Sequence, residues 1–272
     1  AESSFHGRTL ATLSATGQPK YQKGFEPMVK GFKFFKYNDI ASVKKLFEEL
    51  KENNQKASGI LVEPIQGEGG VIPGDKEFFK ELREICNQNN SLLILDEVQS
   101  GVGRTGKMWG YENLEIEPDG FTLAKGLGGG HAIGALLVQK KANIFSPGDH
   151  ASTFGGNPFA CRAAITVLEE IKRRRILKNV FERGNQLNEG FTRISAKFPK
   201  IISGIRGLGL IQGLVINDSY TDAKTITLKA FDKGLLLVPA GGNVVRFVPP
   251  LIISRNEINI LLKKLDLIFE EM

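Results

Sequence analysis

An acid and an amine stand at the ends of two short apolar runs in this sequence. Asp96 ends the run that begins at Leu92, and Lys125 follows the run that begins at Phe121. Both runs have the length and apolar content of short buried strands. In an open parallel sheet, polar groups at the strand ends line the ligand-binding crevice. We therefore expect Asp96 and Lys125 to belong to one site.

This pair has the chemistry that pyridoxal phosphate requires. A lysine amine forms a Schiff base with the aldehyde of the cofactor, and a carboxylate keeps the pyridine nitrogen protonated so that the ring accepts electrons. Two simpler arrangements would account for the residues equally well. Asp96 and Lys125 could form a buried ion pair, or the lysine could simply leave its strand for solvent.

Strands and helices alternate through the first two thirds of the chain, which implies a parallel sheet covered by helices. Beyond about residue 197 short strands and helices predict a smaller α+β domain on a different sheet. We predict an α/β fold with a large domain, 1–175, and a small C-terminal domain, 176–272. The predicted helices of the large domain are Asp39–Asn54, one capped by Asp75, and one from Asn157; its strands are Gly59–Val62, Leu92–Asp96, Phe121–Ala124 and Ile133–Val138.

Composition narrows the classes of protein. The 272 residues are 41% hydrophobic, which suffices for one large domain or for a large and a small one. Cys86 and Cys161 are interpreted as buried thiols, which fits a reducing cytoplasm. No apolar stretch approaches the length of a membrane span. The basic cluster 172–175 ends an amphipathic pattern and is interpreted as a solvated helix end rather than a nucleic-acid patch. The three histidines lack metal-ligand spacing, so we assign no metal.

A glycine-rich stretch after the Asp96 strand suggests a competing function. Residues 101–106 match the dinucleotide pattern G-x-G-x-x-G. That fingerprint requires a helix at the third glycine and an acid that ends the next strand. Here Gly110 and Pro118 interrupt any long helix, and Asp119 precedes the next strand. We therefore predict a loop, and a nicotinamide-dependent oxidoreductase remains a rival hypothesis.

Two further segments carry aromatic and charged side chains. Phe5 could stack on a pyridine ring and Arg8 could grip a carboxylate, although residues of these types are more often a core aromatic and a surface cation. Glu63 and Glu68 lie on a glycine-bearing loop after a strand. Either these acids are solvated, or one of them masks an arginine when a neutral substrate end is bound.

Two other segments complete the candidates. Ser152 and Thr153 precede a helix, where hydroxyl groups could cap the helix or contact a phosphate. Arg246 lies within an apolar strand, where an unpaired charge is costly. That environment makes Arg246 a better functional candidate than any surface arginine.

Six segments together resemble the class III pyridoxal-phosphate aminotransferases of fold type I. They occur in order at suitable spacing, and the resemblance covers essentially all 272 residues. It implies a fold type I large domain with a mainly parallel sheet and helices on both faces, followed by a small α+β domain. The segments are SFHGRTLATLSATGQ, EPIQGEGG, LILDEVQSGVGRTG, LAKGLGGG, STFGGNP and VRFVPPL.

The resemblance implies a role for each matching residue. Lys125 would carry the cofactor and later shuttle a proton as a neutral amine, while Asp96 would pair with the pyridinium. Phe5 and Val98 would enclose the ring, and Gln99 would contact its hydroxyl. The cofactor-binding set is Phe5, Asp96, Glu97, Val98, Gln99, Lys125 and Thr153.

The resemblance also implies substrates and a partner. It is close to family members that transfer the side-chain amine of N-acetylornithine to 2-oxoglutarate, giving glutamate, in arginine biosynthesis. Arg8 would hold the carboxylate of the amine donor. Arg246 would bind 2-oxoglutarate, with Glu68 screening it in the first half-reaction. Thr153 would reach across a homodimer interface to the cofactor phosphate; Glu63 and Ser152 complete the substrate-binding set.

One departure from the family concerns the N-terminus. In the family, SFHGRT lies well inside the chain, after a Ser-Gly-containing loop and helix start that cradle the phosphate. We therefore expect this sequence, which begins at Ala1, to be a fragment with weakened cofactor binding. The alternatives are a related ω-aminotransferase acting on ornithine, succinylornithine or 4-aminobutyrate, and a non-catalytic fragment.

Overall fold

The computed structural model describes all 272 residues, and its contacts divide the chain into two compact units. The first unit comprises Ala1–Pro64, Gly74–Val102 and Trp109–Glu170. The second comprises Ile65–Pro73, Gly103–Met108 and Ile171–Met272.

The first unit is built on a four-stranded sheet of mainly parallel strands. Its order is β1-β4-β5-β6, with β1, β4 and β5 parallel and β6 antiparallel to β5. All four strands were predicted from the sequence, with ends that differ by one or two residues at β5 and β6. The bounds are β1 Gly59–Val62, β4 Leu92–Asp96, β5 Gly120–Leu123 and β6 Ala135–Val138.

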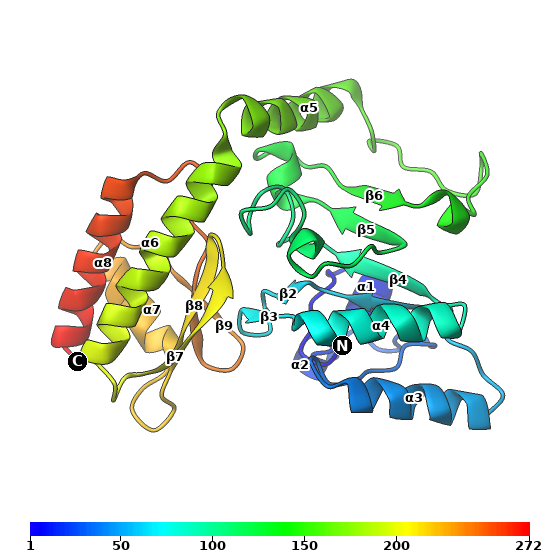
Figure 1. The fold of residues 1–272 in the computed structure, drawn as a ribbon, viewed down its shortest axis with the longest axis horizontal. Coiled ribbons are helices and arrows are strands. Elements are labelled where there is room, and N and C mark those ends of the chain that lie inside the picture. Colours follow the sequence, from blue (N-terminus) through cyan, green and yellow to red (C-terminus); the bar gives the residue numbers. More distant parts are fainter. The chain divides into compact units, whose positions relative to one another are not determined.

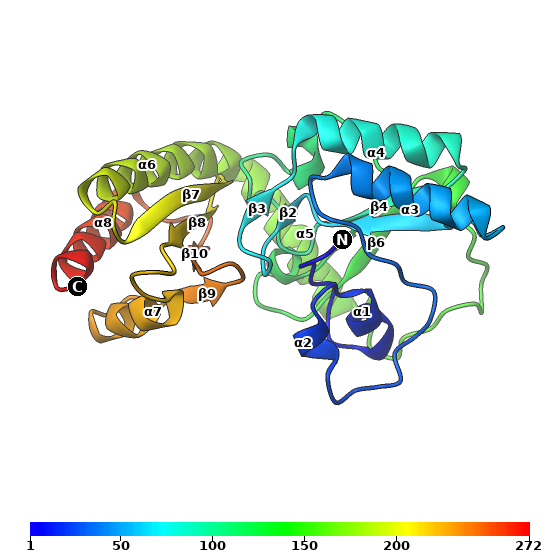
Figure 2. The same cartoon turned by 90° about the horizontal axis from the view of Figure 1, so that it is seen from below.

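Two helices, α3 (Ile40–Glu52) and α4 (Lys76–Gln88), lie side by side along this sheet (Figures 1 and 2). Both are amphipathic, as predicted, and their apolar stripes pack with the buried side chains of β1 and β4. Asp39 caps α3, because its side chain accepts a hydrogen bond from the Ser42 amide at 3.1 Å. Asp75 occupies the same position before α4, but its side chain makes no capping hydrogen bond.

The first unit also contains most of the helix α5 (Pro158–Arg173) and several short helical elements. Asn157 opens α5, where its Oδ1 accepts a hydrogen bond from the Ala160 amide at 3.0 Å. No helix of the structure combines the length and apolar character that crossing a membrane would need. The remaining helices of this unit are α1 Leu10–Ala15 and α2 Pro19–Gln22, with 3₁₀ turns η1 Gly110–Asn113, η2 Lys125–Gly128 and η3 Lys140–Ala142.

The second unit is an antiparallel sheet of order β7-β8-β10-β9 with three helices. Helices α6 (Ile176–Lys197) and α8 (Arg255–Glu270) lie side by side in both views (Figures 1 and 2). They bury Leu187, Phe191 and other apolar residues against the sheet. This architecture confirms a small α+β fold on its own sheet. The other elements are α7 Ala223–Asp232, β7 Ile202–Leu208, β8 Ile211–Ile216, β9 Val238–Ala240 and β10 Val244–Phe247, with a hairpin of β2 Ile65–Gln66 and β3 Ile72–Pro73.

The division into units differs from the predicted boundary after residue 175. The change falls after Glu170, inside α5, and two loop segments of the predicted large domain group with the second unit. One reason is packing, because Val71 is fully buried with Ile211 and Val244. The other is polar: Arg104 Nη1 donates to the carbonyl oxygens of Leu210 and Pro249, and burial lowers the pKa of this guanidinium to about 10. Neither contact is visible from the local sequence.

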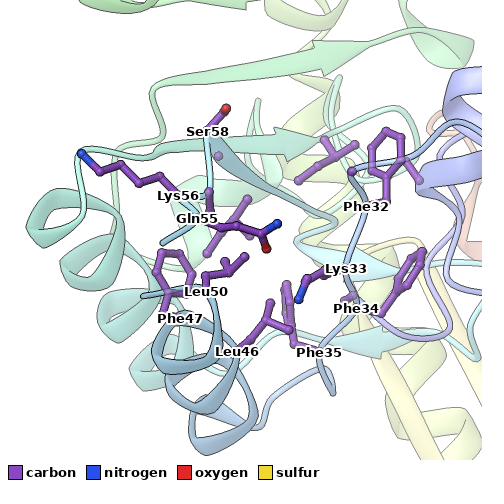
Figure 3. A pocket seen from close by; sticks show the side chains of 17 residues that line it. Phe32, Lys33, Phe34, Phe35, Leu46, Phe47, Leu50, Gln55, Lys56 and Ser58 are labelled. Atoms are coloured by element: carbon purple, nitrogen blue, oxygen red, sulfur yellow. The ribbon is translucent and has the colours of Figure 1, made fainter. Parts of the chain in front are cut away.

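A cavity of about 750 Å³ lies along β1 in the first unit (Figure 3). Because β1 ends the strand order, one of its two sides has no neighbouring strand. The cavity is lined there by Gly59–Leu61, by Leu46, Phe47 and Leu50 of α3, and by the segment 31–35. None of the predicted site residues lines this cavity.

Asp119 ties α4, β4 and the loop before β5 together. Its Oδ2 accepts hydrogen bonds from Arg83 Nη1 at 2.6 Å and from the Leu93 amide at 2.8 Å, and Lys141 lies at its Oδ1. Burial alone would raise the pKa of Asp119, but the Lys141, Leu93 and Arg83 contacts hold it below its usual value. The carboxylate is 1% exposed, so its loss should leave Arg83 without a counter-charge.

We expect Asp119→Asn to lower the free energy of unfolding by about 2–4 kcal/mol at pH 7, since it breaks a buried ion pair while keeping the shape of the side chain. Because the folded-state pKa is lowered, this stabilisation is present above the ordinary pKa near 4 and is lost as the pH falls through the folded value. Urea unfolding at several pH values should therefore show the two proteins converging below about pH 4.

The matched control is Glu115→Gln, which removes an acid from an exposed pair with Lys76. Glu115→Gln should change the free energy of unfolding little both at pH 7 and below pH 4. Equal effects of the two substitutions at pH 7 would contradict the anchoring role of Asp119.

Candidate active site

Asp96 and Lys125 follow neighbouring parallel strands, as the sequence predicts. Asp96 is the last residue of β4 and pairs in register with Thr122 of β5, and Lys125 follows two residues after the end of β5. The Glu97 amide continues the pairing with a hydrogen bond to the Thr122 carbonyl oxygen at 3.0 Å. The two strand ends are thus fixed against each other at the edge where parallel sheets bind ligands.

Each carboxylate oxygen of Asp96 has its own hydrogen-bond donors. Oδ1 accepts from the Val98 amide at 3.1 Å and from the Thr122 hydroxyl at 3.3 Å. Oδ2 lies 2.8 Å from Nδ1 of His6. Because Asp96 is only 8% exposed, water cannot solvate its negative charge fully. Hydrogen-bond donors from three different segments stabilise the charge instead.

Lys125 has an unusual backbone. Its φ is +40°, in the left-handed region that non-glycine residues rarely adopt, and it opens the 3₁₀ turn η2. The residue is exposed. Strain of this kind is concentrated at functional sites, where the surrounding structure holds it in place. The side chain of Asp96 meets the His6 ring, and Lys125 leaves its strand through a strained turn and is exposed.

Glu97 anchors the loop that follows β4. Its Oε2 accepts hydrogen bonds from Ser100 Oγ at 2.7 Å and from the Gly110 amide at 2.8 Å, and its Oε1 accepts from the Tyr111 amide at 2.7 Å. Burial raises the pKa of Glu97, and the three donors oppose that effect. A Cβ at residue 110 would lie 2.7 Å from Oε2, so this approach requires glycine. Glu97 therefore holds the loop that presents Val98 and Gln99, and its predicted cofactor contact stays a prediction.

The segment 4–8 is also held by side chains from other elements. The Phe5 amide donates to Glu63 Oε1 at 2.9 Å, and Glu63 is 3% exposed. The Phe5 ring meets Tyr21 edge-on, and the Arg8 guanidinium lies 4.4 Å from the centre of the Tyr21 ring. Glu63 therefore supports the main chain of Phe5, and its predicted substrate contact stays a prediction. Arg8 is exposed and lies beside two aromatic rings.

Ser152 and Thr153 are exposed in the first unit, before α5. The Ser152 hydroxyl accepts a hydrogen bond from the Gly155 amide at 3.0 Å and so shapes a turn. Asn157, rather than either hydroxyl, caps α5. The hydroxyl of Thr153 thus has no part in starting the helix, which leaves its predicted phosphate contact as a proposal.

Arg246 and Glu68 form an ion pair within the second unit. Arg246 Nη1 donates to Glu68 Oε1 at 2.7 Å, with the arginine side chain 8% exposed and the glutamate 25% exposed. Arg246 lies on β10, which is buried throughout. The carbonyl oxygen of Glu68 also accepts a hydrogen bond from the Gly241 amide at 2.9 Å, which fixes the loop that carries Glu68 within the same unit. The structure thus pairs the arginine and the acid that the sequence predicted to act together.

The residues at the ends of β4 and β5 fit pyridoxal phosphate. A buried carboxylate with donors on both oxygens can balance a protonated pyridine nitrogen, and a neighbouring exposed amine can reach an aldehyde. The structure holds no cluster of three or more His, Cys, Asp or Glu side chains that could bind a metal ion. The glycine-rich stretch 101–106 forms turns without a helix at Gly106, which removes the structural basis for the dinucleotide hypothesis.

Sequence reasoning missed two members of this site, His6 and Thr122. His6 was considered only as a metal ligand, and its partner Asp96 lies 90 positions away, where no local pattern reveals it. Thr122 could have been found, since a hydroxyl within an apolar strand next to Lys125 is a polar group in need of a partner.

Comparison with known proteins places the chain in one family. The family model described as Aminotransferase class-III matches residues 1–269. The acetylornithine aminotransferase of Prochlorococcus marinus subsp. pastoris is 97% identical over 272 residues, which are 100% of this chain and 66% of that protein. The enzyme of the same name from Parasynechococcus marenigrum is 58% identical over 100% of this chain and 65% of its own length. The chain thus spans slightly less than two thirds of these relatives.

Solved structures agree with this assignment. The ornithine aminotransferase of Toxoplasma gondii superposes with a TM-score of 0.90 at 32% identity, over 99% of this chain and 63% of that one. The N-acetylornithine aminotransferase of Stenotrophomonas maltophilia has a TM-score of 0.77 at 37% identity, over 89% of this chain and 63% of that one. A second structure of the Toxoplasma enzyme is described as having pyridoxal phosphate at its active site in partial occupancy. These similarities confirm the predicted fold type I architecture.

The left-handed backbone of Lys125 predicts an inverted order of stability for two substitutions. We expect Lys125→Gly to be more stable than Lys125→Ala by about 1 kcal/mol, because glycine adopts a positive φ without a steric penalty. Thermal and urea unfolding of the two variants measure the difference.

Lys45, an exposed residue within α3, supplies the control. There the alanine variant should be the more stable by about 1 kcal/mol, since glycine is unfavourable inside a helix. The same order at both positions would mean that Lys125 carries no backbone strain.

Proposed function

This chain belongs to the class-III aminotransferase family, and we propose that it transfers the side-chain amino group of N2-acetyl-L-ornithine to 2-oxoglutarate with pyridoxal 5'-phosphate as cofactor. The products are N-acetylglutamate semialdehyde and glutamate, and the reaction serves arginine biosynthesis. The single observation that carries the proposal is the pairing of β4 with β5, which fixes a buried carboxylate and an exposed lysine at one edge of the sheet.

The residues at the strand ends divide the chemistry of the transfer. When bound, pyridoxal phosphate supplies an electron sink for the carbon that carries the amine. The Lys125 amine holds the aldehyde end and moves the proton between the substrate carbon and the cofactor at its Nζ. The Asp96 carboxylate holds a proton on the pyridine nitrogen, which requires Asp96 to stay negatively charged. Phe5, Val98 and Gln99 orient the ring.

Two arginines bind carboxylates in this proposal. Arg8, held by the rings of Phe5 and Tyr21, takes the carboxylate of N-acetylornithine so that the distant amine is the one that reacts. Arg246 takes a carboxylate of 2-oxoglutarate in the second half-reaction. In the first half-reaction Arg246 stays paired with Glu68. The charge of this buried arginine is then balanced while the uncharged end of the substrate lies beside it.

The identity of the amine donor rests on similarity. Relatives that are 97% and 58% identical carry the name acetylornithine aminotransferase, whereas the structural neighbour with TM-score 0.90 is an ornithine aminotransferase at 32% identity. The higher identities favour N-acetylornithine. Ornithine, succinylornithine and 4-aminobutyrate are the donors that a test must compare.

We further propose a homodimer with shared active sites, located in the cytoplasm. The support for a dimer is the position of Ser152 and Thr153, which are exposed and hence available to a neighbouring subunit. Thr153 would contact the cofactor phosphate of that neighbour. Small, charged metabolites of amino-acid biosynthesis are the substrates, which suits a cytoplasmic enzyme.

A spectrum and a donor series test the function. With pyridoxal phosphate, the protein should develop a visible absorption band that bleaches on addition of N-acetylornithine and returns with 2-oxoglutarate. Lys125→Ala should lose transamination by at least about 10⁴-fold, since the amine both binds the cofactor and moves the proton. The variant should keep its far-ultraviolet circular dichroism.

Faster bleaching by ornithine or 4-aminobutyrate than by N-acetylornithine would assign the protein to another donor. Appreciable turnover by Lys125→Ala would contradict the mechanism. Absence of any band in the unsubstituted protein would favour a non-catalytic chain.

The Glu68–Arg246 pair predicts opposite effects on the two substrates. Glu68→Gln should lower the KM for 2-oxoglutarate by roughly 3–10-fold, because Arg246 no longer has to leave a charged partner. The same change should slow the half-reaction with N-acetylornithine, since a partly buried cation then faces an uncharged group.

Stopped-flow measurement of each half-reaction separates these effects. Glu270 of α8 forms an exposed ion pair with Lys197 of α6, so Glu270→Gln is the charge-matched control and should change neither rate. A parallel loss in both half-reactions would mean that Glu68 only supports the fold.

A further inference from the structure

The imidazole of His6 has one hydrogen-bond partner, and that partner is Asp96. Nδ1 of His6 lies 2.8 Å from Asp96 Oδ2, with the histidine side chain 2% exposed and the aspartate side chain 10% exposed. The other ring nitrogen, Nε2, is buried and makes no hydrogen bond. The polar contribution of this buried ring is therefore confined to the Asp96 carboxylate.

The main chain around His6 is fixed from several directions. The His6 amide donates to Thr16 Oγ1 at 3.0 Å, and this fully buried hydroxyl donates in turn to the Thr12 carbonyl oxygen at 3.0 Å. The preceding amide, that of Phe5, donates to Glu63. These two amide hydrogen bonds fix the main chain that places the His6 ring at Asp96, so the contact is built into the fold.

The two carboxylate oxygens of Asp96 accept hydrogen bonds from different donors. Oδ1 receives donors from its own strand end and from β5, through the Val98 amide and the Thr122 hydroxyl. Oδ2 receives the histidine ring. An ionised carboxylate only accepts hydrogen bonds, so Nδ1 must carry the proton in this contact. Removing that donor leaves a buried carboxylate oxygen unsatisfied.

We propose that His6 is a positioning residue that keeps Asp96 ionised and aimed at the cofactor. This inference rests on the proposed function. A donor on the charged form of an acid favours that form. By donating its Nδ1 proton, His6 would keep Asp96 a carboxylate, so that a bound cofactor would keep the proton on its pyridine nitrogen. Without this donor, the proton shifts toward Asp96 and the ring becomes a weaker electron acceptor.

Two polar substitutions of His6 separate this role from packing. The amide nitrogen of asparagine can occupy the place of Nδ1, whereas that of glutamine reaches the place of Nε2. We expect His6→Asn to keep the contact with Asp96 and His6→Gln to lose it. Both variants carry the same functional group and differ by one methylene.

The direct readout is the ¹⁵N chemical shift of the bound cofactor, labelled at its pyridine nitrogen. The unsubstituted protein and His6→Asn should show a pyridinium signal, and His6→Gln should move toward the neutral pyridine. As the pyridine nitrogen loses its proton, kcat should fall about tenfold or more for each unit by which the pKa of that nitrogen drops. The KM for N-acetylornithine should change little. A pyridinium signal in His6→Gln equal to that of the unsubstituted protein would overturn the inference.

A second measurement uses the protein without cofactor. A double-mutant cycle of His6→Gln and Asp96→Asn in urea unfolding should reveal coupling between the two residues, and His6→Asn should retain part of it. Additive effects would also overturn the inference. Failure of the proposed function is distinguishable, because then the unsubstituted protein gives no bound-cofactor signal while the coupling persists.

Discussion

The negative charge of Asp96 is the constraint on which the rest of the site depends. A carboxylate that is 8% exposed is stable only when donors replace the water it has lost, and here the donors come from segments far apart in the sequence. His6, Val98 and Thr122 reach it from the segment before α1, from the loop after β4 and from β5. Satisfying one charge therefore requires that all three segments be in place.

A second set of buried carboxylates holds those segments. Glu97 collects three donors from the loop that follows β4, Glu63 accepts the amide of Phe5, and Asp119 fixes the beginnings of β4 and β5 to α4 and Arg83. These acids contact main-chain amides, a hydroxyl group or cationic side chains. The first unit thus uses acidic side chains for two purposes, as anchors for loops and as the counter-charge of the cofactor ring.

Periodicity and turn residues predicted the strands and helices well because each element depends on its own apolar pattern. The approach of Asp96 to the Lys125 strand was also predictable, since parallel strands end at the same edge. What escaped prediction depends on distant partners. The His6 contact spans 90 residues, and the segments 65–73 and 103–108 join the second unit through Val71 and Arg104. The amide partners of Glu63 and Glu97 escaped for the same reason, because a motif identifies an acid without stating which amides donate to it.

The unpaired side of β1 has a consequence for the dynamics of the sheet. Along any edge strand, alternate amides point away from the neighbouring strand, and in β1 these face the cavity bounded by α3 and the segment 31–35. Such amides exchange their hydrogens with solvent without any opening of the sheet, whereas those of β4, paired on both sides, exchange only when strands separate. Deuterium uptake should therefore be faster in β1 than in β4 and β5, and the slowest-exchanging part of this sheet would be the two strands that lead to Asp96 and Lys125.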